Sequence, residues 1–497
     1  MSREPLVGGL PVEEVALWHR VRRFAVPRWM IEGATAARLA GDWRAACAAA
    51  AVDVALDPAR IGAAHGDAGR DAAEADLAHL APDLLRWHLP RALVAGTMLM
   101  GGRVVLLARY GGGGHEREHG YGREHRHEPG SPASYLVART PPAWDAPQRP
   151  VLDFVAADDP GLRRAYLVDD WTAARHFWDA RHAPQLRAWC GGAAGRLPFF
   201  RADGTPLGAR ELPDTEPGPA DPAAMEEWIA VLQARGDTVG AFTAAGVEVD
   251  PATWALPARW GPGQPEAIVS ALPLDLPRIV RELPRLIAAG YAARFRLPGT
   301  YRGDVVLEAA GPGAGAALRA QVTSYTSTGA TVPGMVWRRA PDLQLVRTGR
   351  LAPEELHPLV AAALFPAAGP AAGPPGPASV LEPVRVRCRG ECHLVGFRDG
   401  ELRIPHSARE QQREQALTAF GGAVSGCFAV RRAWATGQGR LPRALRPLRR
   451  EVFERARHGD TPGIDALLAA GLDPAVRDPE SGDTLARMLE RLAPGAG

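Results

Sequence analysis

The 497-residue sequence contains no lysine and no asparagine, so all 58 of its basic residues are arginine. Arginine must therefore fill the solvated positions that lysine ordinarily shares, and arginine clusters are weak evidence for phosphate binding in this chain. The 58 arginines face 56 acidic residues, which leaves a formal net charge of +2. So small an excess gives no whole-chain electrostatic footprint, and neither nucleic acid nor a membrane surface is expected as a partner.

Cysteine and long apolar runs are also scarce. Five cysteines are too few for a disulfide framework in a chain of this length. The first ten residues hold no apolar segment of the secretory type. The longest weakly interrupted apolar stretch, Leu89 to Leu107, contains Pro90, Arg91 and Arg103 and falls short of a spanning helix. A cytoplasmic protein without a membrane contact is expected.

What the sequence does contain is an internal similarity. Shifting the chain by 195 residues places 27–54 on 222–249, with ten of 28 positions identical. A second block follows in the same order, 84–96 on 279–290. The valine-rich segment 104–106 then matches 305–307. Because similar blocks recur in one order at nearly one spacing, we interpret the chain as two tandem related modules.

Each module is expected to begin with a helix pair. Gly41 and Gly236 are the residue type that can end a helix in the left-handed conformation. Asp42 and Asp237, which come next, can cap the following helix. A further helix and a β-hairpin with alternating apolar residues follow in both copies. Because the strands cluster after helices, the predicted fold class is α+β rather than doubly wound.

Composition shifts divide the chain further. The predicted organisation is a first α+β module at 1–212 and a second, related one at 213–365. A Pro/Gly-rich linker, 366–380, precedes a small β-rich unit at 381–437 and a helical element at 438–497. Within the β-rich unit, CFAVRRAW (427–434) is expected to form a strand, and Ser407 and Glu410 a capping box.

The C-terminal element contains a series of small and apolar residues at specific spacings. These are Ala456, Gly459, Asp460, Ile464, Leu467, Leu468, Ala470, Gly471, Leu472, Asp473, Asp478, Gly482 and Thr484. In this order they resemble the ankyrin repeat over residues 448–490, although the family's Thr-Pro-Leu-His is here Thr484-Leu485-Ala486-Arg487. The resemblance implies a protein-binding turn at Asp473, Arg477 and Asp478. About one and a half repeats cannot bury a core alone, so this element is expected to dock on the preceding domain or to cap it.

Two short motifs suggest chemistry that their surroundings do not support. HEREH (115–119) has the histidine spacing of zinc proteases, but it lies in a glycine- and histidine-rich tract, 111–130, instead of a helix. The loop of the second copy that contains Gly311, Gly313 and Ala316 fits a relaxed dinucleotide fingerprint without its acidic partner. Both motifs are interpreted as variable loops, in equivalent positions of the two copies.

A third group of residues points to a metal. Cys388, Cys392 and His393, with His406 and Cys427, are ligand types that zinc prefers. The spacing in Cys388–Cys392 is not the tight zinc knuckle, so the cysteines are interpreted as small hydrophobic residues beside a sheet. No metal, no cofactor and no catalytic residue is assigned. The arginine-rich stretch 440–457 is interpreted as a solvated helix face.

These observations favour a non-enzymatic protein-interaction or scaffold protein with protein partners. The alternative is an enzyme, a metal-dependent hydrolase with scattered residues. The enzyme alternative is favoured if one pocket gathers Cys388, Cys392, His393 and His406, or if His115 and His119 share one ordered helix face.

Overall fold

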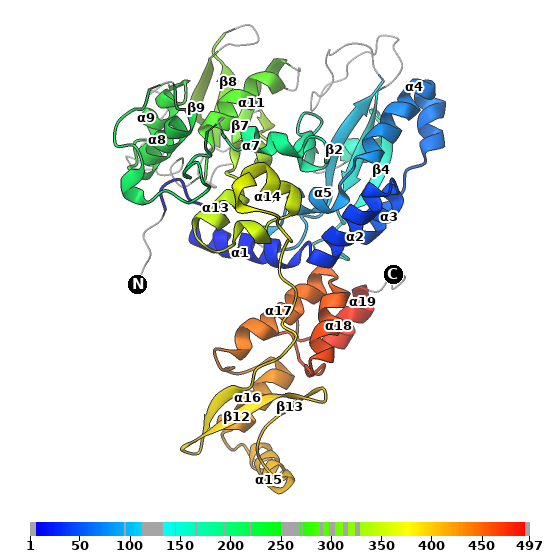
Figure 1. Cartoon of the computed structure of the whole chain (residues 1–497), viewed down its shortest axis with the longest axis vertical. Helices are drawn as coiled ribbons and strands as arrows, with labels where there is room; N and C mark the ends of the chain where they lie inside the picture. Colours follow the sequence, from blue (N-terminus) through cyan, green and yellow to red (C-terminus); the bar gives the residue numbers. More distant parts are fainter. Residues whose placement is uncertain are drawn as a thin grey trace.

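The computed structural model has three folded parts, shown in Figure 1. Two β-sheets lie in the upper part with α1 below them, and a third part, residues 381–492, projects beneath. The described residues are 6–93, 96–111, 133–144, 146–164, 167–192, 195–218, 220–249, 269, 272–288, 292–297, 304–311, 317–323 and 329–492. HEREH (115–119), Gly313 and Ala316 lie outside them. Among the described helices, none is long and apolar enough to cross a bilayer.

The first module contains a five-stranded sheet in the order β1-β4-β3-β2-β5. Its strands are β1 (Asp53–Val54), β2 (Arg103–Tyr110), β3 (Ser134–Arg139), β4 (Val151–Ala156) and β5 (Leu167–Asp170). Its helices are α1 (Val12–Phe24), α2 (Arg28–Leu39), α3 (Trp43–Ala49), α4 (Pro58–Ala78), α5 (Pro82–His88), α6 (Pro160–Arg164) and α7 (Leu186–Trp189). The three central strands are antiparallel, and each edge strand runs parallel to its neighbour.

The second module repeats this sheet, in the order β10-β7-β8-β9-β6. Its strands are β6 (Val247–Val249), β7 (Arg294–Leu297), β8 (Asp304–Ala309), β9 (Leu318–Thr323) and β10 (Ala330–Thr331). Its helices are α8 (Pro222–Ala234), α9 (Thr238–Ala244), α11 (Leu276–Ala288), α12 (Gly334–Trp337), α13 (Pro341–Arg347) and α14 (Pro358–Leu364). Numbered from its own first strand, each sheet has the order 1-4-3-2-5, with parallel pairs at both edges.

A backbone contact repeats as well. The Ala81 N–H before α5 donates to the Trp178 carbonyl at 2.8 Å, and the Asp275 N–H before α11 donates to the Trp337 carbonyl at the same distance. The α+β class is therefore confirmed, and the matching strand order supports the predicted tandem relation.

Strand order corrects one detail of the sequence match. β2 of the first sheet corresponds to β7 of the second and β3 to β8, whereas the valine-rich runs 104–106 and 305–307 lie on β2 and β8. The similar runs had been aligned one strand out of register. The histidine-rich tract therefore joins β2 to β3, while the glycine-rich segment after Ala309 joins β8 to β9. The two loops are not equivalent. The lack of histidine in the second loop is therefore no argument against the HEREH motif in the first.

The helix–Gly-Asp–helix turn occurs three times. Gly41, Gly236 and Gly459 have φ of 79°, 79° and 74°, in the left-handed region where a Cβ is unfavourable. The carboxylates that follow accept the N–H of the residue three positions on, at 2.9, 2.8 and 2.9 Å for Asp42, Asp237 and Asp460. Predicted in both modules and in the C-terminal element, this turn is confirmed in all three.

The hydrophobic cores do not follow the predicted division into modules 1–212 and 213–365. α13 and α14 belong to the second copy in sequence, but Leu345, Val360 and Leu364 lie in the core formed by residues 10–200. Arg22 of α1 donates to Asp342 of α13 at 2.7 and 2.9 Å, and both side chains are almost fully buried. A cavity of about 650 Å³ lies between the two modules. The modules are therefore joined through a shared core and a buried ion pair.

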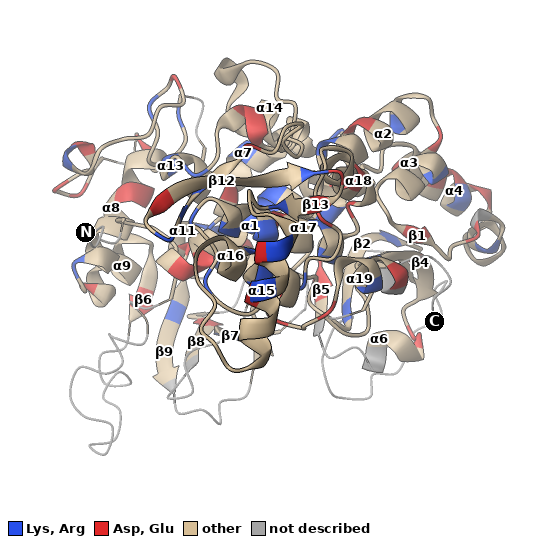
Figure 2. Ribbon diagram, turned by 90° about the horizontal axis from the view of Figure 1, so that it is seen from below, with Lys and Arg blue, Asp and Glu red and all other residues tan. Residues whose placement is uncertain are grey.

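The third part combines the predicted β-rich unit and the helical element. Its elements are β11 (Val384–Cys388), β12 (Glu391–Arg398), β13 (Glu401–Arg403), α15 (Ala408–Ala419), α16 (Gly426–Thr436), α17 (Leu445–His458), α18 (Thr461–Ala469) and α19 (Leu485–Leu492). One hydrophobic core runs from Val386 to Met488 and includes residues of both ranges. We call residues 381–492 the C-terminal unit. Seen from below, β12, β13 and α15 of this unit lie in front of α1 (Figure 2).

One predicted element is wrong and one is confirmed. Residues 427–434 form α16, not a strand, because their buried side chains, Cys427, Val430 and Trp434, recur at helical spacing. The capping box of α15 is present: Ser407 and Glu410 each accept the other's backbone N–H, at 3.3 and 2.8 Å.

The C-terminal unit docks on the first module through the Gly459-Asp460 turn, in which Asp460 is buried. The indole N–H of Trp29 donates to Asp460 Oδ1 at 2.7 Å, and the Arg455 guanidinium donates to the other carboxylate oxygen. Nearby, Thr97 and Arg20 donate to the two oxygens of Glu454 at 2.7 and 2.8 Å. The expected docking of the helical element on the preceding domain is thus present.

The two aspartates Asp42 and Asp460 provide a matched pair for testing this docking. Asp42 caps an exposed helix, so Asp42→Ala should cost about 1 kcal/mol of stability. Asp460 is fully buried, and Asp460→Ala leaves the Trp29 indole N–H without its acceptor and Arg455 with Glu451 as its remaining carboxylate, which should cost about 2–4 kcal/mol. Denaturant unfolding of both variants measures the difference. Equal losses of stability would show that the Asp460 turn is not buried against Trp29.

Candidate metal centre

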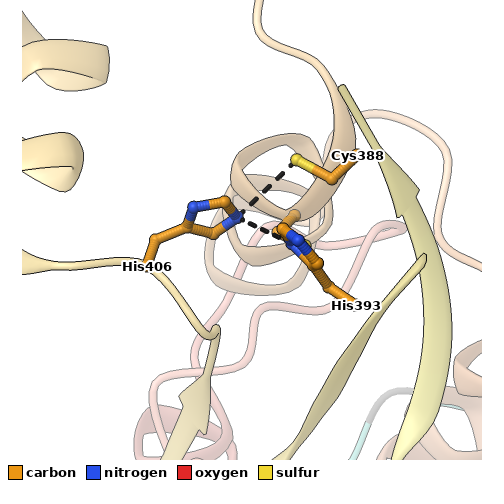
Figure 3. A group of neighbouring side chains, drawn as sticks. Cys388, His393 and His406 are labelled. Atoms are coloured by element: carbon orange, nitrogen blue, oxygen red, sulfur yellow. Dashed lines mark hydrogen bonds between the residues drawn. The ribbon is translucent and has the colours of Figure 1, made fainter. Parts of the chain in front are cut away.

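Four side chains from separate elements of the C-terminal unit converge on one point. Cys388 ends β11, His393 lies on β12, His406 follows β13, and Cys427 lies in the first turn of α16. Their ligand atoms all lie within 4.8 Å of one another. Figure 3 shows Cys388, His393 and His406 pointing toward one another from the hairpin and the segment after it.

Three of the six distances between the ligand atoms match those of a tetrahedral site. His393 Nδ1 is 3.2 Å from His406 Nε2, Cys388 Sγ is 3.6 Å from His406 Nε2, and Cys427 Sγ is 3.5 Å from His393 Nδ1. Zinc bonds of about 2.3 Å to sulfur and about 2.0–2.1 Å to nitrogen, at tetrahedral angles, give roughly 3.3 Å between two nitrogens and about 3.6 Å between nitrogen and sulfur. Two thiolates and two imidazoles are also the ligand set of structural Cys₂His₂ zinc sites. The four residues therefore fit Zn²⁺ in both chemistry and spacing.

The close approach of α16 to the hairpin depends on Gly426. Its φ is 57°, and a Cβ there would lie 2.5 Å from Cys388 Sγ and 3.0 Å from the Cys388 Cα. A side chain at this position would occupy the space between the two cysteines. A glycine directly before Cys427 thus lets the start of the helix reach the thiol across from it.

Burial and outer contacts complete the site. Cys388 and Cys427 are 2% and 0% exposed, and the His406 ring packs on Phe428 with ring centroids 4.6 Å apart. The ring nitrogens not aimed at the centre approach carboxylates, His393 Nε2 at 3.4 Å from Glu391 and His406 Nδ1 at 3.8 Å from Glu410. Such carboxylates orient metal-bound imidazoles. In the protein without metal, the pKa of the Cys427 thiol is raised to about 12. Burial is the larger cause, and the adjacent Cys388 is the second.

The structure separates Cys392 from the other predicted ligands. Cys392 is exposed, because it neighbours His393 on β12 and alternate residues of a strand face opposite sides. The expectation that both cysteines lie beside the sheet as small hydrophobic residues therefore does not describe the site: Cys388 joins a ligand cluster and Cys392 faces solvent. The signal that could have found the cluster is Cys388 and His393 on either side of the Arg389-Gly390 turn, combined with a helix instead of a strand at Cys427.

The predicted ankyrin-like binding turn is only partly exposed. Asp478 is 2% exposed and accepts hydrogen bonds from Arg457 at 2.7 Å and Ser481 at 3.0 Å. Arg477 is exposed and donates to the Gly482 carbonyl at 2.9 Å, and Asp473 accepts the Ala475 N–H at 2.9 Å. Asp478 therefore stabilises the turn from within, and only Asp473 and Arg477 are accessible to a partner.

Comparison with known proteins adds no relative. No family model, no curated protein and no solved structure matches this chain. The ankyrin resemblance therefore rests on the residues themselves, and the metal centre on its geometry.

Gly426 and Gly421 offer a local test of the geometry. Both have positive φ, but a Cβ on Gly421 would meet nothing within 4 Å. Gly421→Ala should cost about 1 kcal/mol, the ordinary penalty for a left-handed alanine. Gly426→Ala should cost clearly more and lower the zinc content of the purified protein, because α16 must move away from Cys388. Unfolding curves and metal analysis measure both effects. Equal behaviour of the two variants would contradict the packing described for Gly426.

Proposed function

We propose that this chain is a non-enzymatic binding protein whose C-terminal unit is held together by one structural zinc ion. The carrying observation is the cluster of Cys388, His393, His406 and Cys427, with spacings that match a tetrahedral Zn²⁺ site. Zinc would crosslink β11, β12, the segment after β13 and the start of α16.

Four protein ligands favour a structural role over a catalytic one. Catalytic zinc sites keep one position for water or substrate and use three protein ligands, whereas structural sites are closed by four. Here the two sulfurs belong to almost fully buried cysteines, and the His406 side chain is 4% exposed. These features argue against the alternative of a metal-dependent hydrolase at this site.

The position of the cluster explains why a crosslink is needed. Three short strands and α15 hold few buried side chains, and α15 has none. The core residues around the cluster, Val386, Val395 and Phe428, continue into those of α17 and α18. Small units with little core commonly gain their stability from a metal. Zinc would thereby fix the exposed surfaces of the hairpin and α15 relative to the body of the protein.

Exposed surfaces of this unit support an interaction role. Leu394, Leu417 and Phe420 are 59%, 48% and 91% exposed, and they are among the most exposed large apolar side chains of the described chain. The body of the protein supplies a rigid base through the Trp29–Asp460 contact. A binding protein that presents the C-terminal unit is consistent with these features.

Zinc analysis of the purified chain tests the proposal. Protein produced with zinc in the medium should retain one Zn²⁺ per chain after dialysis, and Co²⁺ substitution should give the visible spectrum of a tetrahedral thiolate site. Cys388→Ser, His406→Ala and Cys427→Ser should each lose most of the metal. They should also destabilise the C-terminal unit, because the free energy of metal binding then no longer contributes to folding.

Cys392→Ser is the matched control, since this cysteine lies on the same hairpin but faces solvent. It should retain one zinc ion. A wild-type chain without zinc, or a Cys392→Ser variant that loses as much zinc as Cys388→Ser, would contradict the proposed site.

A further inference from the structure

The three-stranded sheet of the C-terminal unit has one face in the core and one in solvent. Val386, Cys388, Val395 and Leu402 are buried on the inner face. The ladder pairs Arg385 with Leu394, Arg387 with Cys392, Arg403 with Gly396, and Arg398 with Glu401. Because paired residues share a face and alternate residues change face, these residues lie together on the outer side. We call Arg385, Arg387, Arg398, Arg403 and Leu394 the basic face.

The stretch of sequence that contains this face has an excess of positive charge. Residues 381–450 hold 14 arginines and 6 acidic residues, an excess of eight positive charges, whereas the rest of the chain has 44 arginines and 50 acidic residues. The absence of lysine does not explain this separation, since an arginine in place of a lysine leaves the charge unchanged. The whole C-terminal unit, residues 381–492, holds 19 arginines and 15 acidic residues, so its positive excess lies before residue 451, in the part that contains the basic face.

The arginines of the basic face are also available to a ligand. In the modules many arginines are fixed by carboxylates, as Arg22 is by Asp342 and Arg175 by Asp76. Arg385, Arg387 and Arg398 are exposed and form no ion pair with any residue that the structure describes. Arg403 pairs with Glu401 at 3.3 Å. Arg385 and Arg387 therefore lie beside Leu394, which is 59% exposed, whereas Arg398 lies further along β12, opposite Glu401.

We propose that the basic face binds the phosphate backbone of double-stranded nucleic acid. Guanidinium groups bind phosphates in a bidentate manner, and arginines two positions apart on a strand are spaced about 6.6 Å along it. A two-stranded β-ribbon also has the width that the major groove of B-DNA admits. The proposal rests on the proposed function, because zinc fixes the hairpin that carries these arginines. It revises the expectation from total charge that nucleic acid is not a partner.

The opposite side of the same sheet supports this assignment. Cys388 and His393 lie on the inner side of β11 and β12, in the ligand cluster. A metal bound there would fix the hairpin with its outer arginines facing solvent. The apolar Leu394 between them can contact sugars or the edges of bases. An acidic protein or an anionic membrane would also attract the arginines, and the experiment below distinguishes these partners.

Salt-dependent binding to a labelled DNA duplex tests the proposal. The zinc-loaded full-length protein should bind a short fluorescein-labelled duplex, with affinity that falls steeply as NaCl rises. The triple variant Arg385→Gln/Arg387→Gln/Arg398→Gln should bind at least about tenfold more weakly and lower the slope of log K against log salt by about 3, one for each lost phosphate contact.

The matched control is Arg60→Gln/Arg210→Gln/Arg235→Gln, which removes the same charge from exposed arginines of the two modules. This control should keep the wild-type slope. The proposal is overturned if zinc-loaded wild-type protein does not bind the duplex, or if both triple variants behave alike. It is also overturned if binding is seen only with poly-glutamate or with vesicles of anionic phospholipid.

Zinc content measured on the same samples separates this test from the one above. A chain that holds one zinc ion but does not bind the duplex contradicts the nucleic-acid partner and leaves the zinc site intact. A chain that binds the duplex without zinc contradicts the structural zinc and leaves the basic face intact.

Discussion

The convergence of two thiols and two imidazoles determines how the C-terminal unit is built. Cys388, His393, His406 and Cys427 come from β11, β12, the segment after β13 and α16, which also contribute Val386, Val395, Ile404 and Phe428 to one hydrophobic core. Without a metal, the two thiols and two imidazoles contact one another through hydrogen bonds of 3.2 to 3.6 Å. With Zn²⁺ the same atoms become the strongest crosslink in the unit. The exposed faces of the hairpin depend on that crosslink for their position.

The two modules, whose sheets have the same strand order, form one body. Each sheet has its own core, yet α13 and α14 from the second copy complete the core of the first. The buried Arg22–Asp342 pair, which neither module could satisfy alone, lies at this junction. The third Gly-Asp turn then connects the C-terminal unit to the same body, because Asp460 accepts from Trp29 as well as from its own helix. One local motif thus serves as an exposed cap twice and as a buried contact once.

Local signals in the sequence predicted the local structure well. Gly41 and Gly236 with their aspartates identified two helix pairs, and Ser407 with Glu410 identified the start of α15, because capping depends on residues close in sequence. The sequence did not predict which strands of the two sheets are equivalent. The valine-rich runs on β2 and β8 are similar, but these two strands do not occupy equivalent positions in the two sheets. Strand order is set by packing across the sheet, which such a run does not encode.

The metal centre was predicted less well than the helix caps but better than the strand equivalence. All four ligands stood among the candidates, but the choice between them depended on structure that the residue pattern left ambiguous. A short apolar run such as CFAVRRAW fits a strand or a buried helix equally well. Only as helix α16 does it bring Cys427 to Cys388, and only the strand alternation on β12 turns His393 inward and Cys392 outward.

X-ray absorption at the zinc edge of the purified, full-length protein tests the central claim most directly. The account predicts two sulfur ligands at about 2.3 Å and two nitrogen ligands at about 2.0–2.1 Å, with the multiple-scattering features of imidazole. A first shell made of oxygen, or a single sulfur with bound water, would contradict a closed site formed by Cys388, His393, His406 and Cys427.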